Sequence, residues 1–406
     1  MACDRADLIQ TADSDNNVFG RTMVSIPVAC SGTNLTRRQN PNKLDLTAGG
    51  SSGGEGALVR MRGSVLGVGT DIAGSIRIPA LCCGTYGFRP SSNRVPFGGQ
   101  AAPVRAGYPA DIMPVAGPLA RSARDVRLWL ETVLHAKPWD SDWSCLAMPW
   151  TPVPTKSLTV GVVIEDPALP VAPPIVRAIK LATEKLQAAG HTIIPLEKFP
   201  SFREGSTLAW DYFDLDNDGT GFKFIDDSGE PWTPSVQGLY APPPEGRPPR
   251  SLDDLFAMNV KRAQFKAGWH QIFGQNQLDV IVAPGHHATA VPHDTYGFTP
   301  YTVMWNLVNV NLAVPLTLPV ADLSSQYPAC IIPYLTADKS IDVADLRIPS
   351  CRLALSRLTR LQADGPLLDD PEVVDGVPCH IQVIARPEHD EALMSAVEVI
   401  EEALQS

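Results

Sequence analysis

Apolar and polar positions between residues 158 and 196 follow a pattern that predicts a strand, a helix and a second strand. LTVGVVI (158–164) is a short apolar run typical of a buried strand. From 173 to 190, apolar side chains recur three or four residues apart, after two prolines that suit a first helical turn and before a glycine that ends a helix. HTIIPL (191–196) is the second strand. Such a unit joins parallel strands, so part of the sheet is predicted to be parallel.

The same patterns predict further elements on both sides of this unit. We expect strands at 65–71, 278–284 and 377–386, and helices at 55–64, 121–134 and 389–405. Residues 200–260 are polar and rich in proline, and we expect long surface loops there. The apolar segment 304–320 is predicted to be buried core.

The chain is predicted to form one domain over residues 1–406, with three regions. Residues 1–135 contain a segment rich in glycine and serine, 136–157 are a connector rich in proline and tryptophan, and 158–406 form the remainder. A single extended core is compatible with this length.

Composition and charge narrow the class of protein. The 406 residues are 44% hydrophobic and 19% charged, as in ordinary globular proteins. A net charge of −11 without any basic run argues against nucleic acid as a partner. No apolar run is long enough to span a membrane, and the first residues lack the apolar segment of a signal peptide. We therefore expect a cytoplasmic protein, in which the eight cysteines are reduced and the adjacent Cys82 and Cys83 are buried structural thiols.

Two glycine-containing clusters between residues 46 and 88 carry the candidate chemistry. GGSSGG (49–54) leads into a predicted helix, where backbone N–H groups point at whatever lies before the first turn. IAGS (72–75) is a tight turn after a strand, and consecutive N–H groups in such a turn can converge into an oxyanion hole. Ser75 ends this turn and is the candidate nucleophile.

Other interpretations of these motifs have less support. GGSSGG lacks the lysine of a phosphate-binding P-loop, although by itself it leaves a purely structural glycine-rich loop open. His286, His287 and His293 lack a metal-ligand spacing with a carboxylate partner, so we expect a loop that follows a strand. No metal and no cofactor are predicted.

Several blocks of the sequence resemble the amidase signature family. The signature region is matched by GGSSGG, GVGTDIAGSIRIPA and CCGTYGFRP, and similar blocks are NNVFGRT (16–22), NPNKLDLTAGG (40–50), VAGPLARSARDV (115–126), APGHHATAVPHD (283–294) and residues 375–401. The first two of these outer blocks and TAVPHD look most like fungal general amidases and acetamidases. The resemblance implies an α/β fold with a mixed, mainly parallel β-sheet between layers of α-helices. It also implies hydrolysis of a carboxylic acid amide to a carboxylate and ammonia or an amine through a serine acyl-enzyme.

The resemblance also assigns residue roles. Ser75 would be the nucleophile, and Ser51, after a cis peptide bond in the family, would relay its proton to a lysine. The oxyanion hole and substrate contacts would come from Ile72, Ala73, Gly74, Ser75 and Ser51. Asp71 and Arg77 would tie the turn to the loops, and Ser52 would hydrogen-bond within its own loop.

The chain departs from the family at the lysine. The family places it well upstream of GGSSGG in a lysine–aspartate motif, whereas the only lysine here before Ser51 is Lys43, which we interpret as a surface residue. The absence of this upstream lysine leads us to expect an N-terminally truncated or wrongly assembled gene product. Two segments that are unlike the family, 23–39 and 323–360, support the same expectation. Three functions stay open: an active amidase on a small-molecule amide, an inactive amidase-like protein, and an amidotransferase A-type subunit. The sequence also leaves a homodimer open.

Overall fold

An eight-stranded mixed β-sheet forms the centre of the computed structural model. The structure describes residues 13–17, 20–22, 44–100, 105, 112–154, 157–216, 219–234, 236, 249–308, 327–342 and 370–406. Lys43, residues 23–39 and most of 323–360 lie outside these ranges, as does the second part of the predicted core segment 304–320.

The order of the strands explains how distant parts of the sequence meet. From one edge to the other it is β3 (Leu66–Asp71), β5 (Val115–Ala120), β4 (Tyr86–Arg89), β9 (Ala329–Thr336), β10 (Pro378–Ala385), β8 (Val280–Ala283), β6 (Thr159–Val162) and β7 (Thr192–Pro195). A separate antiparallel pair joins β1 (Asp15–Asn16) to β2 (Gly20–Arg21). The strand near the C-terminus, β10, therefore lies inside the sheet rather than at its edge.

The mixed sheet confirms the predicted α/β class, but the expectation of mainly parallel pairing is wrong. Only β6–β7 and β6–β8 are parallel, and the other neighbouring strands of this sheet run antiparallel. The strand–helix–strand pattern correctly predicted β6, α4 (Pro173–Ala188) and β7. Strands such as β5 and β10 are buried at every position. A continuous apolar run of this kind carries no signal of strand direction.

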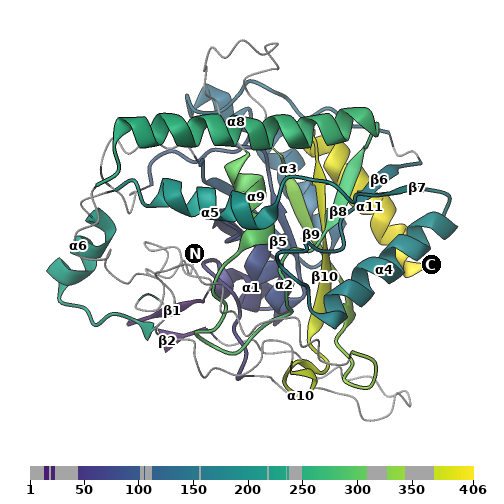
Figure 1. The fold of residues 1–406 in the computed structure, drawn as a ribbon, viewed down its shortest axis with the longest axis horizontal. Helices are drawn as coiled ribbons and strands as arrows, with labels where there is room; N and C mark the ends of the chain where they lie inside the picture. Colours follow the sequence, from purple (N-terminus) through teal and green to yellow (C-terminus); the bar gives the residue numbers. More distant parts are fainter. Residues whose placement is uncertain are drawn as a thin grey trace.

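Helices cover both faces of the sheet, as predicted. One layer consists of α3 (Ala123–His135), α4 and α11 (Asp390–Gln405), which contact one another or the sheet. The other side has α1 (Gly53–Arg60), α2 (Arg77–Cys83), α5 (Phe202–Phe213) and α9 (Pro300–Leu307), with the long α8 (Leu252–Gln275) crossing the top of the view (Figure 1). Cys82 and Cys83 on α2 are buried thiols, and burial raises the pKa of Cys83 to about 12.

Helices occupy much of 200–260, so the expectation of long loops there is wrong. Two of them, α5 and α6 (Thr220–Ser228), lie in this region, and α8 begins in it. Ser201 and Ser251 cap α5 and α8 by accepting backbone N–H groups three residues later, and Asp254 completes a capping box. These caps are a signal that the sequence interpretation passed over, because the apolar pattern of the segment is weak.

An aromatic cluster holds α5, α8 and α9 together. Phe202 and Trp269 have ring centroids 5.6 Å apart, and Trp269 and Trp305 have centroids 4.7 Å apart. All eight residues of α9 are buried. This packing fixes the position of α9, which reaches the candidate site.

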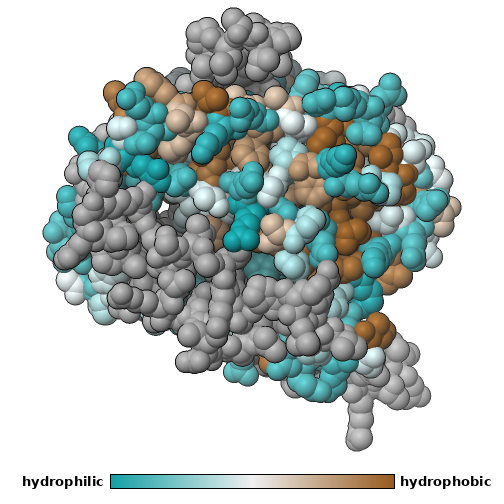
Figure 2. Space-filling model, viewed as in Figure 1, coloured by the Kyte–Doolittle hydropathy of each residue, from teal (hydrophilic) through white to brown (hydrophobic). Residues whose placement is uncertain are grey.

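The solvent-facing side of α8 carries several exposed apolar side chains. Leu252, Phe256 and Val260 are spaced four residues apart and are exposed. Figure 2 shows hydrophobic and hydrophilic side chains interspersed over the region that α8 occupies, without one continuous apolar patch. Within the described ranges, no helix combines the length and the apolar character needed to cross a membrane.

Candidate active site

The glycine-rich loop and the IAGS turn meet at the end of β3. Ser51 lies in the loop before α1, and Ser75 ends the turn before α2. The Ser52 N–H donates to the Ser75 carbonyl at 3.2 Å, and the side chains of Ser51 and Ser75 belong to residues only 7% exposed. The Gly50–Ser51 peptide bond is cis, as the resemblance implied. The structure thus brings both predicted catalytic serines into one buried site.

Ser14, more than 30 residues earlier in the sequence, binds both ends of the glycine-rich loop. Its Oγ lies 3.0 Å from the Gly49 carbonyl, to which it donates, and it accepts the Gly53 N–H at 3.0 Å. Gly49 has φ +76°, and a Cβ there would lie 2.9 Å from the Ile78 carbonyl oxygen, so the position needs glycine. The sequence interpretation missed Ser14, although it lies two residues before a block that resembles the family.

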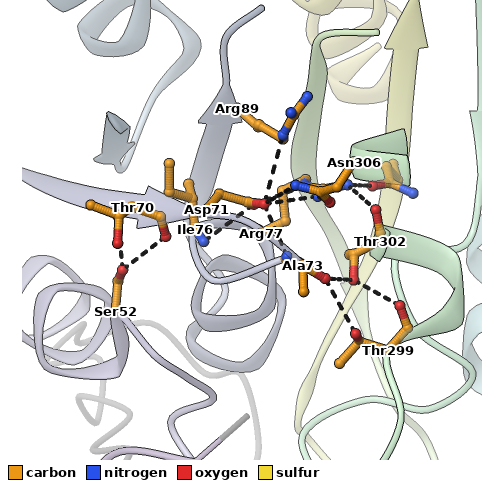
Figure 3. A network of polar contacts seen from close by, with 12 residues as sticks. Ser52, Thr70, Asp71, Ala73, Ile76, Arg77, Arg89, Thr299, Thr302 and Asn306 are labelled. Carbon is orange, nitrogen blue, oxygen red and sulfur yellow. Dashed lines mark hydrogen bonds and ion pairs between the residues drawn. The ribbon is translucent and has the colours of Figure 1, made fainter. Parts of the chain in front are cut away.

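Ser52 contacts β3 rather than its own loop. Its Oγ accepts the Thr70 N–H at 3.2 Å and lies 3.4 Å from the Thr70 carbonyl (Figure 3). A Cβ at Gly69 would lie 2.7 Å from this Oγ. The expectation of a hydrogen bond within the loop is therefore wrong, because Ser52 joins the loop to the strand that precedes the turn.

Asp71, the last residue of β3, organises the turn. Its carboxylate accepts the N–H groups of Gly74 at 2.9 Å and Ile76 at 3.3 Å, two bonds from Arg77, and the Asn306 amide at 2.9 Å (Figure 3). Complete burial alone would raise the pKa of Asp71, but the charge and hydrogen bonds of Arg77, with the charge of Arg89, lower it to about 2. The carboxylate is therefore negatively charged throughout the physiological pH range.

Arg77, the first residue of α2, links this turn to α9 and β10. It donates to the Thr302 carbonyl at 3.0 Å, the Gln382 side chain at 2.9 Å and the Asn306 side chain at 2.6 Å. Asn306 and Gln382 are fully buried, and the sequence interpretation did not identify them as part of the site. A buried polar residue inside an apolar strand, such as Gln382, was the available signal, since such groups need hydrogen-bond partners.

In the part of the chain that the structure describes, three backbone N–H groups of the turn have no hydrogen-bond partner, whereas the carbonyls of its last three residues are all bonded. The carbonyls of Ala73, Gly74 and Ser75 accept bonds from Thr302, Ile78 and Ser52 respectively. Within the described residues, the N–H groups of Ile72, Ala73 and Ser75 have no hydrogen-bond acceptor. The Gly74 N–H is bound to Asp71, so the structure does not bear out Gly74 as a fourth oxyanion donor.

The histidine-rich loop follows β8, as predicted, and its buried side chains are neutral. The rings of His286 and His287 have centroids 3.9 Å apart, and His380 accepts the Gly285 N–H at 3.1 Å. Burial lowers the pKa of His287 to about 4 and that of His380 to about 3. His293 instead is partly exposed, with Nε2 2.8 Å from the Leu44 carbonyl. Nowhere in the part of the chain that the structure describes do three or more possible ligands gather for a metal ion.

Comparison with known proteins identifies the family. A family model described as amidase matches residues 18–394, so the chain belongs to the amidase family. It is 34% identical to an amidase of Gibberella moniliformis over 97% of this chain and 64% of the relative, and 29% identical to an acetamidase of Aspergillus oryzae over 97% and 66%. Among solved structures, a fatty acid amide hydrolase superposes with a TM-score of 0.80 at 28% identity over 99% of this chain and 64% of that one. The chain thus spans slightly less than two thirds of the length of these relatives.

Proposed function

We propose that this site hydrolyses a carboxylic acid amide to a carboxylate and ammonia or an amine, with Ser75 as the nucleophile. The observation that carries this proposal is the turn itself. It presents one serine hydroxyl and three partnerless N–H groups, those of Ile72, Ala73 and Ser75, in a largely buried position. Buried N–H groups are normally satisfied, so an unpaired set suggests a ligand oxygen. The names of the relatives, an amidase and an acetamidase, support an amide as the substrate.

The proposed reaction follows from these groups. The Ser75 oxygen attacks the amide carbon while its proton passes to the Ser51 hydroxyl, which in turn gives its own proton to a base. The three N–H groups stabilise the resulting oxyanion, and each such donor is typically worth about 3 kcal/mol. The C–N bond breaks as the nitrogen takes a proton back through Ser51. Water then hydrolyses the acyl-enzyme and restores the Ser75 hydroxyl.

A second candidate function is an amide-binding protein that does not turn its ligand over. The family resemblance assigns the base to a lysine, and neither Ser51 nor Ser75 has a lysine partner among the described residues. Without a base, attack by a neutral serine hydroxyl is slow. The unpaired N–H groups of the turn would still bind the oxygen of an amide.

Labelling and hydrolysis separate the two functions. The chain is treated with a fluorophosphonate probe, the labelled peptide is found by mass spectrometry, and release of ammonia or amine from acetamide, a long-chain fatty amide and an anilide is measured. For an amidase, Ser75→Ala should abolish labelling and lower hydrolysis by at least about 10³-fold. Ser206→Ala is the matched control, because Ser206 is buried on α5 and its hydroxyl makes no hydrogen bond within the described residues.

Each remaining outcome supports a different conclusion. Hydrolysis that persists in Ser75→Ala would contradict the assigned nucleophile. Absence of both labelling and hydrolysis in the unaltered chain, together with a rise in melting temperature on adding amide, would favour the binding protein.

A further inference from the structure

The peptide between Ala73 and Gly74 is held at both of its polar ends. Its carbonyl oxygen lies 2.7 Å from the Thr302 hydroxyl and 3.2 Å from the Thr299 hydroxyl (Figure 3). Its N–H donates to Asp71 at 2.9 Å. One hydroxyl comes from α9, the other from the residue just before it, and the carboxylate from β3. Residues more than 220 positions apart in the sequence thus bind one peptide group.

The Thr302 hydroxyl makes its shorter hydrogen bond to the turn and its longer one to the start of its own helix. Threonines inside helices commonly donate to a carbonyl three or four residues earlier. The Thr302 hydroxyl lies 3.2 Å from such a carbonyl, that of Thr299, but 2.7 Å from Ala73. The shorter contact identifies Ala73 as the acceptor.

Thr299 adds a second donor to the same carbonyl. It occupies the N-cap position of α9, where a threonine side chain would ordinarily accept an N–H of the first turn. Here it makes no cap bond, and its hydroxyl contacts Ala73 at 3.2 Å. Both threonines are buried, and the Arg77 bond to the Thr302 carbonyl anchors this end of α9 beside the turn.

Because residue 74 is glycine, the Ala73–Gly74 peptide group needs these hydrogen bonds to stay in one orientation. Gly74 has φ +132°, a conformation that other residues rarely adopt, and without a side chain its two peptide groups rotate with little steric resistance. A released Ala73 carbonyl would be an acceptor among the N–H groups of Ile72, Ala73 and Ser75. It would then compete with the substrate oxygen for them.

We propose that Thr302, supported by Thr299, is a positioning residue that keeps the Ala73 carbonyl turned away, so that the N–H groups of Ile72, Ala73 and Ser75 are available to the oxyanion. Thr302 touches neither substrate nor nucleophile in this role. It acts by selecting one orientation of a peptide group. This proposal rests on the proposed amidase function of the Ser75 site.

The test compares Thr302→Val, which removes the hydroxyl at nearly constant volume, with Thr302→Ser, which keeps it. Thr302→Val should lower kcat on the order of 10- to 100-fold with little change in KM, because the lost interaction serves the transition state. It should lower the rate of fluorophosphonate labelling in parallel. Thr302→Ser should recover kcat to within about threefold of the unaltered chain.

Thr183→Val is the matched control. Its hydroxyl also donates to a backbone carbonyl at 2.7 Å, that of Ile179 on α4, on the opposite face of the sheet from α9. This variant should lose a similar amount of thermal stability and keep its kcat. Equal kcat in Thr302→Val and Thr302→Ser, or a fall in Thr183→Val as large as in Thr302→Val, would overturn the proposal.

A crystal structure of Thr302→Val gives a readout that needs no turnover. A rotated Ala73–Gly74 peptide, with the Gly74 N–H released from Asp71, would support the proposal, and an unchanged peptide would overturn it. If the unaltered chain neither labels nor hydrolyses amides, the proposed function fails, and this structure still decides the role of Thr302.

Discussion

Two kinds of buried ionisable residue in this protein have opposite charge states, although burial disfavours the charged form of both. Asp71 remains charged because Arg77, Asn306 and two backbone N–H groups surround its carboxylate. The buried imidazoles of His287 and His380 have no such charged partner among the described residues, and burial keeps them neutral. The acid sensitivity of the folded chain should therefore come first from histidines and only at much lower pH from Asp71.

The free energy of unfolding should fall as the pH drops below about 6.5, the ordinary pKa of histidine. Below that value the unfolded chain binds protons at His287 and His380, whereas in the folded chain the pKa values of these residues are about 4 and about 3. Each of these histidines then lowers the free energy of unfolding by up to about 1.4 kcal/mol per pH unit, until the pH reaches the pKa of that residue in the folded chain. Asp71, whose folded pKa is about 2, contributes stability above about pH 3.8 that is lost only as the pH falls toward 2.

Urea unfolding of His380→Gln between pH 7.5 and 5 checks this expectation. Glutamine keeps an acceptor for the Gly285 N–H but does not titrate, so the stability of the variant should depend less on pH. His270→Gln, a change at an exposed position on α8, should leave the pH dependence as it was. Identical slopes in all three proteins would contradict the assignment of acid sensitivity to His380.

At the scale of elements, the turn between β3 and α2 depends on how closely α9 approaches it. A Cβ at Gly74 would collide with the Thr302 side chain. Gly190, after α4, also has a positive φ, of +90°, but nothing lies within 4 Å of its would-be Cβ. An added Cβ at Gly190 would therefore test backbone strain alone, whereas one at Gly74 would test strain and a steric clash together.

Gly190→Ala should lower the free energy of unfolding by about 1–2 kcal/mol, the cost of a left-handed conformation for alanine. Gly74→Ala should lose more than this, since Thr302 must also move, and labelling of Ser75 should slow with it. Chemical unfolding and probe kinetics on both variants measure the difference. Equal losses of stability, with unchanged labelling of Gly74→Ala, would show that the approach of α9 is not tight.

The sequence predicted the elements that have a strong local pattern. It did not predict features that depend on contacts between distant parts of the chain. The β6–α4–β7 unit and the α11 helix followed directly from apolar periodicity. Ser75 was singled out by its place at the end of a tight turn, whereas Ser51 was assigned through the family resemblance. The direction of the strands could not be predicted, because a strand buried on both faces shows the same apolar run in a parallel and in an antiparallel pair. Ser14, Thr302, Asn306 and Gln382 were missed for a related reason, since they reach the turn only after the sheet has formed.

At the scale of the whole molecule, β10 holds the sheet together. It pairs with β9 on one side and β8 on the other, so within the described residues the strands β8, β6 and β7 join the rest of the sheet only through β10. It is followed directly by α11, whose buried residues include Leu393, Val397 and Ile400. The last 37 residues of the sequence therefore contribute an interior strand and a helix of the core.

A chain that ends at residue 369, without β10 and α11, should show no cooperative unfolding. Removing an interior strand leaves two partial sheets with unpaired edges and exposes the apolar surface that α11 covers. Circular dichroism during urea unfolding, compared with the full chain, measures this. A sigmoidal transition in the shortened chain would mean that the two partial sheets fold without their shared strand.

The bond between Arg77 and Gln382 has a consequence for synthesis on the ribosome. The turn that ends at Ser75 is translated about 300 residues before β10, which brings the Gln382 side chain that completes the Arg77 contacts. Until β10 has been translated, a nascent chain therefore carries the turn without the Arg77–Gln382 bond that joins it to the sheet. Translation of β10, rather than translation of the serine, marks the moment at which the described surroundings of the turn can form.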